Sequence, residues 1–140
     1  MPERRTISEL LDAARGRIDR LTPGDASRAM AGGALLVDTR SGEDLRSLGS
    51  IPGAVHVPLS VLFWRLDPSS GFDDPALSDL DRRVILICAH GYSSSLAAAT
   101  LRDLGFASVA DVIGGFEAWA ADGLPTFRPA TNPPAAKDPR

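Results

Sequence analysis

Short runs of consecutive hydrophobic residues alternate along this chain with stretches in which hydrophobic residues recur every three or four positions. The short runs predict buried β-strands at residues 34–37, 55–57, 84–87 and 109–113. The recurring pattern, with proline near a start or glycine after an end, predicts helices at residues 23–30, 59–66, 96–104 and 116–121. Strands that alternate with helices pair in parallel through crossover connections. We therefore expect an α/β domain with a small parallel sheet and helices on both faces.

The N-terminal segment carries the pattern of an amphipathic helix over residues 6–21. Its apolar positions recur at helical spacing, at Ile7, Leu10, Leu11, Ala14, Ile18 and Leu21. Acidic side chains interrupt its arginines, so we expect this helix to pack on the domain rather than on a membrane surface. The predicted division is an N-terminal helical extension at residues 1–21, a domain at residues 22–125 and a disordered proline-rich tail at residues 126–140.

The only cysteine, Cys88, directly follows the hydrophobic run at residues 84–87. A short loop with a glycine and several hydroxyl residues then leads into a predicted helix. Backbone N–H groups of such a loop and of the helix start favour an anion at the sulfur, which lowers the pKa of a thiol. A free cysteine at the end of a buried strand also packs as a small hydrophobe. This stretch alone leaves a nucleophile and a packing residue equally open.

The composition narrows the classes of function. The 140 residues carry 15 basic and 18 acidic side chains, and this net charge of −3 argues against a general nucleic-acid binder. A single cysteine rules out an intrachain disulfide and a cysteine cluster for zinc. The pair Gly114-Gly115 lacks the flanking residues of a nucleotide-binding loop, and we expect no metal or organic cofactor. Without a membrane-spanning run or a secretory pattern, the chain is expected to be cytoplasmic.

Four motifs, taken in order, resemble those of the rhodanese, or sulfurtransferase, domain. They are Leu36-Val37-Asp38-Thr39-Arg40 followed by Glu43, then Gly49-Ser50-Ile51-Pro52-Gly53-Ala54, then the Cys88 loop, and then Gly114-Gly115-Phe116-Glu117-Ala118-Trp119 followed by Gly123-Leu124-Pro125. Each motif alone is weak. Their order and separation together identify the chain as a rhodanese-like single-domain protein.

The resemblance implies that Cys88 takes a sulfane sulfur from a donor, becomes a persulfide and passes the sulfur to a nucleophilic acceptor. A covalent intermediate of this kind splits one difficult transfer into two easier steps. The loop that follows the cysteine is then the cradle of the sulfur, with the candidate binding residues Ala89, His90, Gly91, Tyr92 and Ser93. The implied partners are a small-molecule sulfur donor and a thiol acceptor, a protein thiol included, with no nucleic acid and no membrane.

One position departs from the family pattern. Active members commonly carry arginine or lysine five residues after the cysteine, where this chain has Ser93. A serine hydroxyl supplies a neutral hydrogen bond, whereas a charge-assisted bond to an anion is about twice as strong. We therefore expect weak activity with thiosulfate.

Other polar residues lie in or beside these motifs. His90 leaves two interpretations open, an imidazole that supplies charge or orients substrate and a solvent-facing loop side chain. Ser94 and Ser95 are expected to cap the following helix. Arg40 and Glu43 are expected to form a structural ion pair, with substrate binding by Arg40 as the less favoured interpretation.

Two other functions compete with sulfur transfer. Ser93 and the N-terminal helix are also compatible with a noncatalytic rhodanese-like binding or regulatory module. A phosphatase or arsenate reductase would likewise use a loop thiolate. Those enzymes bind tetrahedral oxyanions through a loop arginine, so Ser93 counts more heavily against them than against sulfur transfer.

Overall fold

The computed structural model describes residues 3–128, and its centre is one sheet of five parallel strands. The spatial order is β1-β5-β4-β2-β3, so that the fourth strand lies in the middle. The strands are β1 (Asp19–Leu21), β2 (Leu35–Asp38), β3 (Val55–His56), β4 (Val84–Ile87) and β5 (Val109–Val112). The predicted α/β class with a small parallel sheet is confirmed.

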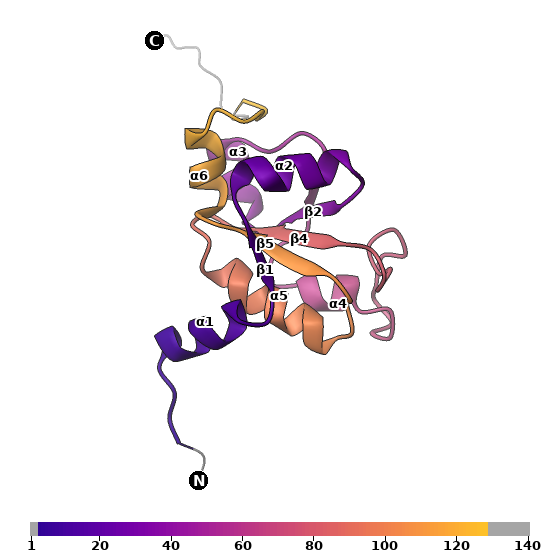
Figure 1. Cartoon of the computed structure of the whole chain (residues 1–140). Helices are drawn as coiled ribbons and strands as arrows, with labels where there is room; N and C mark the ends of the chain where they lie inside the picture. The colour runs from indigo at the N-terminus through magenta and orange to yellow at the C-terminus, as the bar shows by residue number, and fades with distance from the viewer. Residues whose placement is uncertain (1–2, 129–140) are drawn as a thin grey trace.

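Helices cover both faces of this sheet (Figure 1). They are α1 (Ile7–Arg15), α2 (Pro23–Ala31), α3 (Gly42–Leu48), α4 (Leu62–Leu66), α5 (Ser93–Asp103) and α6 (Gly115–Ala121). In Figure 1, α2, α3 and α6 lie above the sheet, and α4 and α5 lie below it with α1 packed on α5. No helix among residues 3–128 has the length and apolar character needed to cross a membrane.

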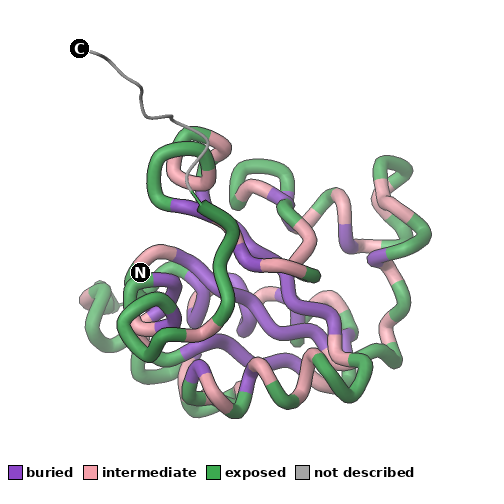
Figure 2. The backbone as a smooth tube through the Cα atoms, turned by 90° about the horizontal axis from the view of Figure 1, so that it is seen from above, coloured by how far each residue is buried: buried purple, intermediate pink, exposed green. Residues whose placement is uncertain are grey.

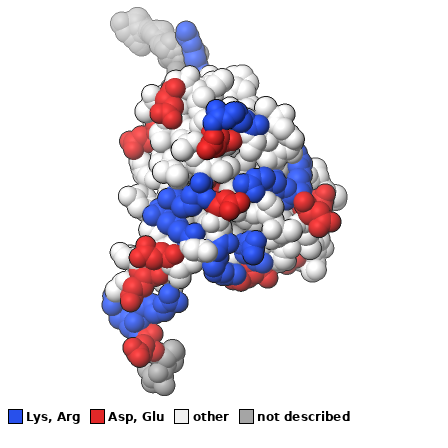
Figure 3. Space-filling model, viewed as in Figure 1, with Lys and Arg blue, Asp and Glu red and all other residues white. Residues whose placement is uncertain are grey.

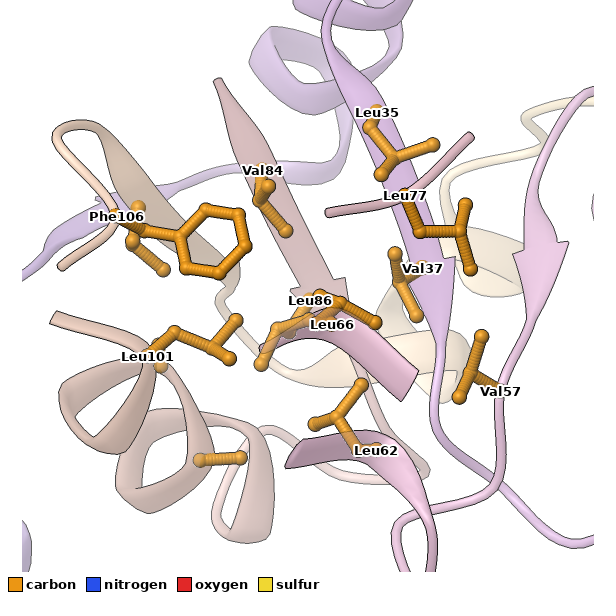
Figure 4. Close-up of a cluster of buried hydrophobic side chains, with 13 residues drawn as sticks. Leu35, Val37, Val57, Leu62, Leu66, Leu77, Val84, Leu86, Leu101 and Phe106 are labelled. Carbon is orange, nitrogen blue, oxygen red and sulfur yellow. The ribbon is translucent and has the colours of Figure 1, made fainter. Parts of the chain in front are cut away.

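Each face of the sheet has its own hydrophobic core, because successive side chains of a strand point to opposite faces. Val84 and Leu86 of β4 join the cluster between the sheet and helices α4 and α5, which Figure 4 shows with Leu62 and Leu66. Ile85 and Ile87 join the opposite cluster. Figure 2 shows the buried strands running through the centre of the molecule with exposed turns around them. The four buried residues of β4 thus fix the strand rigidly before Cys88.

The N-terminal segment differs from the prediction of one helix over residues 6–21. Helix α1 begins after a reciprocal cap between Thr6 and Glu9, and it ends at Arg15 before Gly16. Residues 19–21 are not helical but pair as strand β1 with β5. Glycine disfavours helix continuation, and the open edge of β5 offers backbone groups that need partners. The helix prediction is therefore wrong after residue 15.

Three other helices also differ from expectation. Helix α4 begins at Leu62, three residues after the predicted start. Helix α3 begins after a Ser41 side-chain cap and lies in a segment for which no helix was predicted. Helix α5 begins at Ser93, three residues before the predicted start. The division of the chain at residues 22 and 125 stays a prediction. Of the predicted disordered tail, residues 129–140 lie outside the described residues, and Phe127 pairs with Ser50 in an isolated antiparallel bridge.

Candidate active site

Cys88 lies at the carboxyl end of the central strand, where parallel α/β sheets place their ligand sites. Cys88 is 5% exposed. Its Sγ accepts hydrogen bonds from two backbone N–H groups. The N–H of Gly91 lies 3.2 Å from Sγ and that of Ser94 lies 3.4 Å from it. The Oγ of Ser94 lies 3.2 Å from the same sulfur. The loop therefore wraps around the sulfur with its donors turned inward.

This surrounding changes the acidity of the thiol. Burial raises the pKa of Cys88. Hydrogen bonds from the hydroxyls of Ser94 and Ser93 and from the N–H groups of Ser94 and Gly91 together lower this pKa by a larger amount. The net result is a pKa below the ordinary value of a cysteine thiol. A larger fraction of thiolate, which is the nucleophilic form, is then present near neutral pH.

Ser94 and Ser95 do not cap helix α5, and that prediction is wrong. Both residues are buried inside the helix, and their hydroxyls donate to Oδ2 of Asp111 at 2.8 and 2.7 Å. The helix begins after Tyr92 without a side-chain cap. The buried carboxylate outcompetes the helix terminus for these hydroxyls, because an ionised acceptor makes the stronger hydrogen bond.

Asp111 is a site residue that the sequence reasoning missed. It is fully buried in β5, and the guanidinium of Arg20 in β1 balances its charge at 2.9 Å. Through Ser94, the carboxylate is linked to the Cys88 sulfur. One signal could have revealed it, since aspartate is almost never fully buried without a partner and here interrupts an apolar strand run.

The double glycine at residues 114 and 115 holds the cysteine loop in place. A Cβ at Gly115 would lie 2.5 Å from the carbonyl oxygen of Cys88, so only glycine allows this close approach. The first N–H groups of α6 use the proximity, since Phe116 donates to the Cys88 carbonyl at 2.8 Å and Glu117 donates to the Ala89 carbonyl at 3.2 Å. These bonds turn the loop carbonyls toward α6 and leave the opposite side of the loop to the sulfur.

A cavity of about 430 Å³ lies beside the loop. It combines apolar walls with charged side chains, and its lining residues are Arg40, Asp44, Leu48, Ala89, His90, Phe116, Glu117 and Ala120. Three of the predicted site residues, Arg40, Ala89 and His90, therefore meet at one cavity. A concave site with a few polar groups in an apolar wall is the usual form of a small-molecule site.

Arg40 pairs with Asp38 and not with Glu43, so that predicted ion pair is wrong. Its Nη2 lies 2.8 Å from Oδ2 of Asp38 and also donates to the carbonyl of Gly49 at 2.9 Å. The guanidinium lies 3.7 Å from the ring centre of Phe116. Glu43 is exposed in the first turn of α3, where solvent satisfies its carboxylate, whereas the buried Asp38 needs the counter-charge.

The side chains of His90 and Tyr92 point away from the sulfur. The side chain of His90 is 63% exposed, and its Nδ1 lies 3.5 Å from Oε1 of Glu117. Tyr92 is 61% exposed at the rim, with the guanidinium carbon of Arg15 at 5.6 Å from its ring centre. Of the five predicted cradle residues, Gly91 directs its backbone N–H at Sγ and Ser93 its hydroxyl. Ser94, which was not in that set, supplies the second N–H.

Comparisons with known proteins show the family of this chain. Two curated relatives share the name thiosulfate sulfurtransferase GlpE. The one from Pseudomonas savastanoi pv. phaseolicola is 40% identical over 102 residues, which are 73% of this chain and 87% of that protein. The one from Ectopseudomonas mendocina is 38% identical over 102 residues, with 73% and 84% coverage.

Solved structures show the same fold. A Rhodopseudomonas palustris protein of unknown function, described as a possible tyrosine phosphatase, has a TM-score of 0.81 and 34% identity over 90% of this chain and 98% of that one. The polysulfide-sulfur transferase homodimer of Wolinella succinogenes has a TM-score of 0.67 and 25% identity, with 84% and 83% coverage. The family description "Rhodanese-like domain" matches residues 22–122. The chain therefore belongs to the rhodanese-like family.

Proposed function

We propose that Cys88 is the nucleophile of this sulfurtransferase and carries the transferred sulfur as a persulfide. The observation that carries the proposal is the position of its Sγ. Cys88 directly follows the central strand, and its Sγ accepts hydrogen bonds from the N–H groups of Gly91 and Ser94. Donors fixed in this way stabilise negative charge on the sulfur without having to reorganise during the reaction. The lowered pKa of the thiol supplies the reactive thiolate.

The reaction then proceeds in two displacement steps. The Cys88 thiolate attacks the sulfane sulfur of the donor, a new S–S bond forms, and the old bond to the sulfane sulfur breaks. With thiosulfate, sulfite leaves with the electron pair of that bond. A nucleophilic acceptor, such as a thiolate, next attacks the terminal sulfur of the persulfide. The Cys88 thiolate leaves and is ready for another cycle.

The cavity beside the loop is the proposed binding place for donor and acceptor. Ala89 and His90, which directly follow Cys88, form part of its lining, so a bound molecule lies next to the loop that holds the sulfur. Its carboxylates, from Asp44 and Glu117, oppose anionic substrates, and its one arginine is already paired with Asp38. This favours thiol acceptors with little negative charge, and a protein thiol belongs to that class.

Two sulfur donors are candidates. The relatives named thiosulfate sulfurtransferase support thiosulfate, and the relative named polysulfide-sulfur transferase supports polysulfide. The exposed Ser93 provides no cation for the sulfonate end of thiosulfate. We therefore infer that thiosulfate is used less efficiently than by a relative with arginine at that position.

Phosphate-ester hydrolysis is not favoured. The Rhodopseudomonas palustris neighbour is described as a possible tyrosine phosphatase. A dianionic phosphoryl group needs a cation that can bind it bidentately in the loop. In this chain the loop position holds Ser93, and the nearby Arg40 is buried against Asp38.

Mass spectrometry of the intact protein tests the proposal. After exposure to thiosulfate or polysulfide without an acceptor, the wild type is expected to gain the mass of one sulfur atom, and cyanide should remove it as thiocyanate. Cys88→Ser should gain no sulfur, because a serine hydroxyl forms no persulfide. Thr100→Ala serves as a control, because Thr100 lies outside the loop and its cavity and the change leaves the sulfur and its N–H donors in place. A wild type that gains no sulfur from either donor would overturn the proposal.

A further inference from the structure

Two arginines from the N-terminal segment converge on one carbonyl of the cysteine loop. Arg15 at the end of α1 donates its Nη2 to the Gly91 carbonyl at 2.7 Å, and Arg20 in β1 donates its Nη2 to the same oxygen at 3.1 Å. Both arginines precede the region that matches the family description, residues 22–122. The N–H of the same Gly91 is one of the two backbone donors to the Cys88 sulfur.

We propose that Arg15 and Arg20 are positioning residues for sulfur transfer, which hold the Gly91 carbonyl outward and thereby keep the Gly91 N–H directed at the Cys88 sulfur. Gly91 adopts φ +85°, and a Cβ there would lie 2.7 Å from the backbone nitrogen of Gly114, so its conformation suits glycine alone. Glycine is also the residue with the most backbone freedom. The Gly91 carbonyl belongs to the peptide group shared with Tyr92 and the Gly91 N–H to the one shared with His90, so an anchor on the carbonyl restrains the backbone of Gly91 and, through its Cα, the direction of its N–H. The inference rests on the proposed role of Cys88.

The guanidinium of Arg15 contacts the cysteine loop and helix α5, which follows the loop. Besides the Gly91 carbonyl, it donates its Nε to Oγ of Ser95 at 3.1 Å and lies over the ring of Tyr92. Within residues 3–128, no carboxylate forms an ion pair with it. An arginine that only fastened α1 to the domain would be expected to resemble Arg17, which pairs with Asp103 on the surface of α5.

Arg20 reaches the sulfur by a second route. Its Nε donates to Oδ1 of the buried Asp111 at 2.9 Å, and Oδ2 of Asp111 accepts the hydroxyl of Ser94 at 2.8 Å. The Oγ of Ser94 is the group that lies 3.2 Å from Sγ. One guanidinium therefore anchors both the Gly91 carbonyl and the carboxylate that orients Ser94.

The two arginines also bring positive charge to a loop that has none at Ser93. The charged groups around the loop are Arg15 from α1, Arg20 from β1, Asp111 from β5 and Glu117 from α6, which lies beside His90. Asp111 neutralises one of the two guanidinium charges, so the charge of Arg15 remains. The face shown in Figure 3 carries interspersed acidic and basic side chains and, among the described residues, no broad positive patch, so the positive charge of Arg15 acts only on the groups close to it.

The test compares Arg15→Met with Arg17→Met, a matched control on the same segment. Cys88 is the only cysteine, so the rate of alkylation by iodoacetamide across pH measures its ionisation alone. Thiocyanate formation from thiosulfate and cyanide measures kcat/KM. We expect Arg15→Met to move the alkylation midpoint to higher pH and to lower kcat/KM about tenfold, since outright removal of an oxyanion donor costs about 100- to 1000-fold. Arg17→Met should stay within about twofold of the wild type, because exposed ion pairs contribute little.

Two conservative variants sharpen the outcome. Arg15→Lys keeps one charged donor for the Gly91 carbonyl and should recover part of the loss. Arg20→Lys keeps the counter-charge of Asp111 but replaces the planar fork, so it should lower kcat/KM while the protein stays folded. Alkylation and kcat/KM of Arg15→Met that equal those of Arg17→Met would overturn the inference. If the wild type forms neither persulfide nor thiocyanate, the proposed function fails, and the alkylation profiles alone decide the positioning role.

Discussion

Ser94 occupies the centre of the site because its hydroxyl lies between the sulfur and a buried carboxylate. Its Oγ is 3.2 Å from Cys88 Sγ and 2.8 Å from Asp111 Oδ2. A serine hydroxyl has one proton to donate and can accept as well. In the thiol form the S–H donates to Oγ, while the hydroxyl donates to Asp111. In the thiolate form the hydroxyl turns to the sulfur, and Asp111 keeps the bonds from Ser95 and Arg20.

Replacement of Ser94 by alanine is therefore expected to raise the pKa of Cys88. The hydroxyl bond stabilises the thiolate, so its loss favours the thiol and moves the alkylation midpoint up by roughly 0.5 to 1 pH unit. Near neutral pH the alkylation rate should fall, while above both midpoints the two proteins should react equally fast. Thr100→Ala is the control on the same helix, since its hydroxyl bonds to the carbonyl of Leu96. A midpoint that stays in place or moves down would contradict this role of Ser94.

Which of these residues the sequence could reveal depends on the distance along the chain to their partners. Cys88 stood out because its strand, loop and helix are contiguous, and its backbone cradle is local. Arg20 and Asp111 lie 91 residues apart, and Arg15 lies 76 residues from Gly91. No local pattern encodes such a pairing. Arg40 had two acidic neighbours, and burial of Asp38 rather than sequence spacing selected the partner.

At the scale of elements, the loop is held between two helices. The start of α5 supplies the Ser94 N–H to the sulfur, and the start of α6 supplies two N–H groups to the carbonyls of Cys88 and Ala89. Unpaired N–H groups at a helix start need such acceptors. The turn at Gly114 and Gly115 brings α6 close enough to reach them, with φ of +76° and +64°. The motif that resembles the family thus has a structural reason in this chain.

Gly115→Ala should therefore damage both stability and reactivity. The new Cβ would lie 2.5 Å from the Cys88 carbonyl oxygen and 2.7 Å from the backbone of Ala89 and His90, so the loop must shift. The expected cost in free energy of unfolding is about 2–5 kcal/mol, from the left-handed backbone and from overpacking together. Urea unfolding measures the stability, and alkylation of Cys88 at neutral pH should slow.

Gly123→Ala is the matched control for that change. Gly123 has φ +74°, but a Cβ there meets nothing within 4 Å, so only the backbone strain is added. We expect it to cost less free energy of unfolding than Gly115→Ala and to leave the alkylation rate unchanged. Equal effects of the two substitutions would show that the close approach of α6 to the loop is unimportant.

The periodicity of hydrophobic residues predicted most elements because the two cores enforce it. Strands β2, β4 and β5 are buried over their full length. Strand β4 is a continuous apolar run, and the runs of β2 and β5 are broken only by Asp38 and Asp111. Strand β1 was not predicted, because Asp19 to Leu21 lie at the edge of the sheet and none of them is fully buried. These residues also continue the helical spacing of α1. Helix α3 was not predicted because none of its residues is buried, so its sequence carries no apolar stripe.

At the scale of the whole molecule, the N-terminal segment is part of the sheet and of the site. Strand β1 covers the edge of β5, and α1 packs along α5. The region that matches the family description begins at residue 22, after both elements. Residues 7–21 therefore complete the edge of the sheet and the buried charge pair of Arg20 with Asp111. The other parts of both structures lie far along the chain.

A chain that begins at Thr22 tests whether the rhodanese-like region folds alone. The truncation exposes the edge of β5 and leaves Asp111 buried without Arg20, which costs about 3–5 kcal/mol for a broken buried pair. Domains are stable by only about 5–15 kcal/mol, so we expect a large fall in Tm or loss of cooperative unfolding. Removal of residues 1–5 is the control, since it spares the cap at Thr6 and all of α1. A truncated chain with the Tm and alkylation profile of the wild type would make residues 1–21 a separable extension, as the sequence pattern predicted.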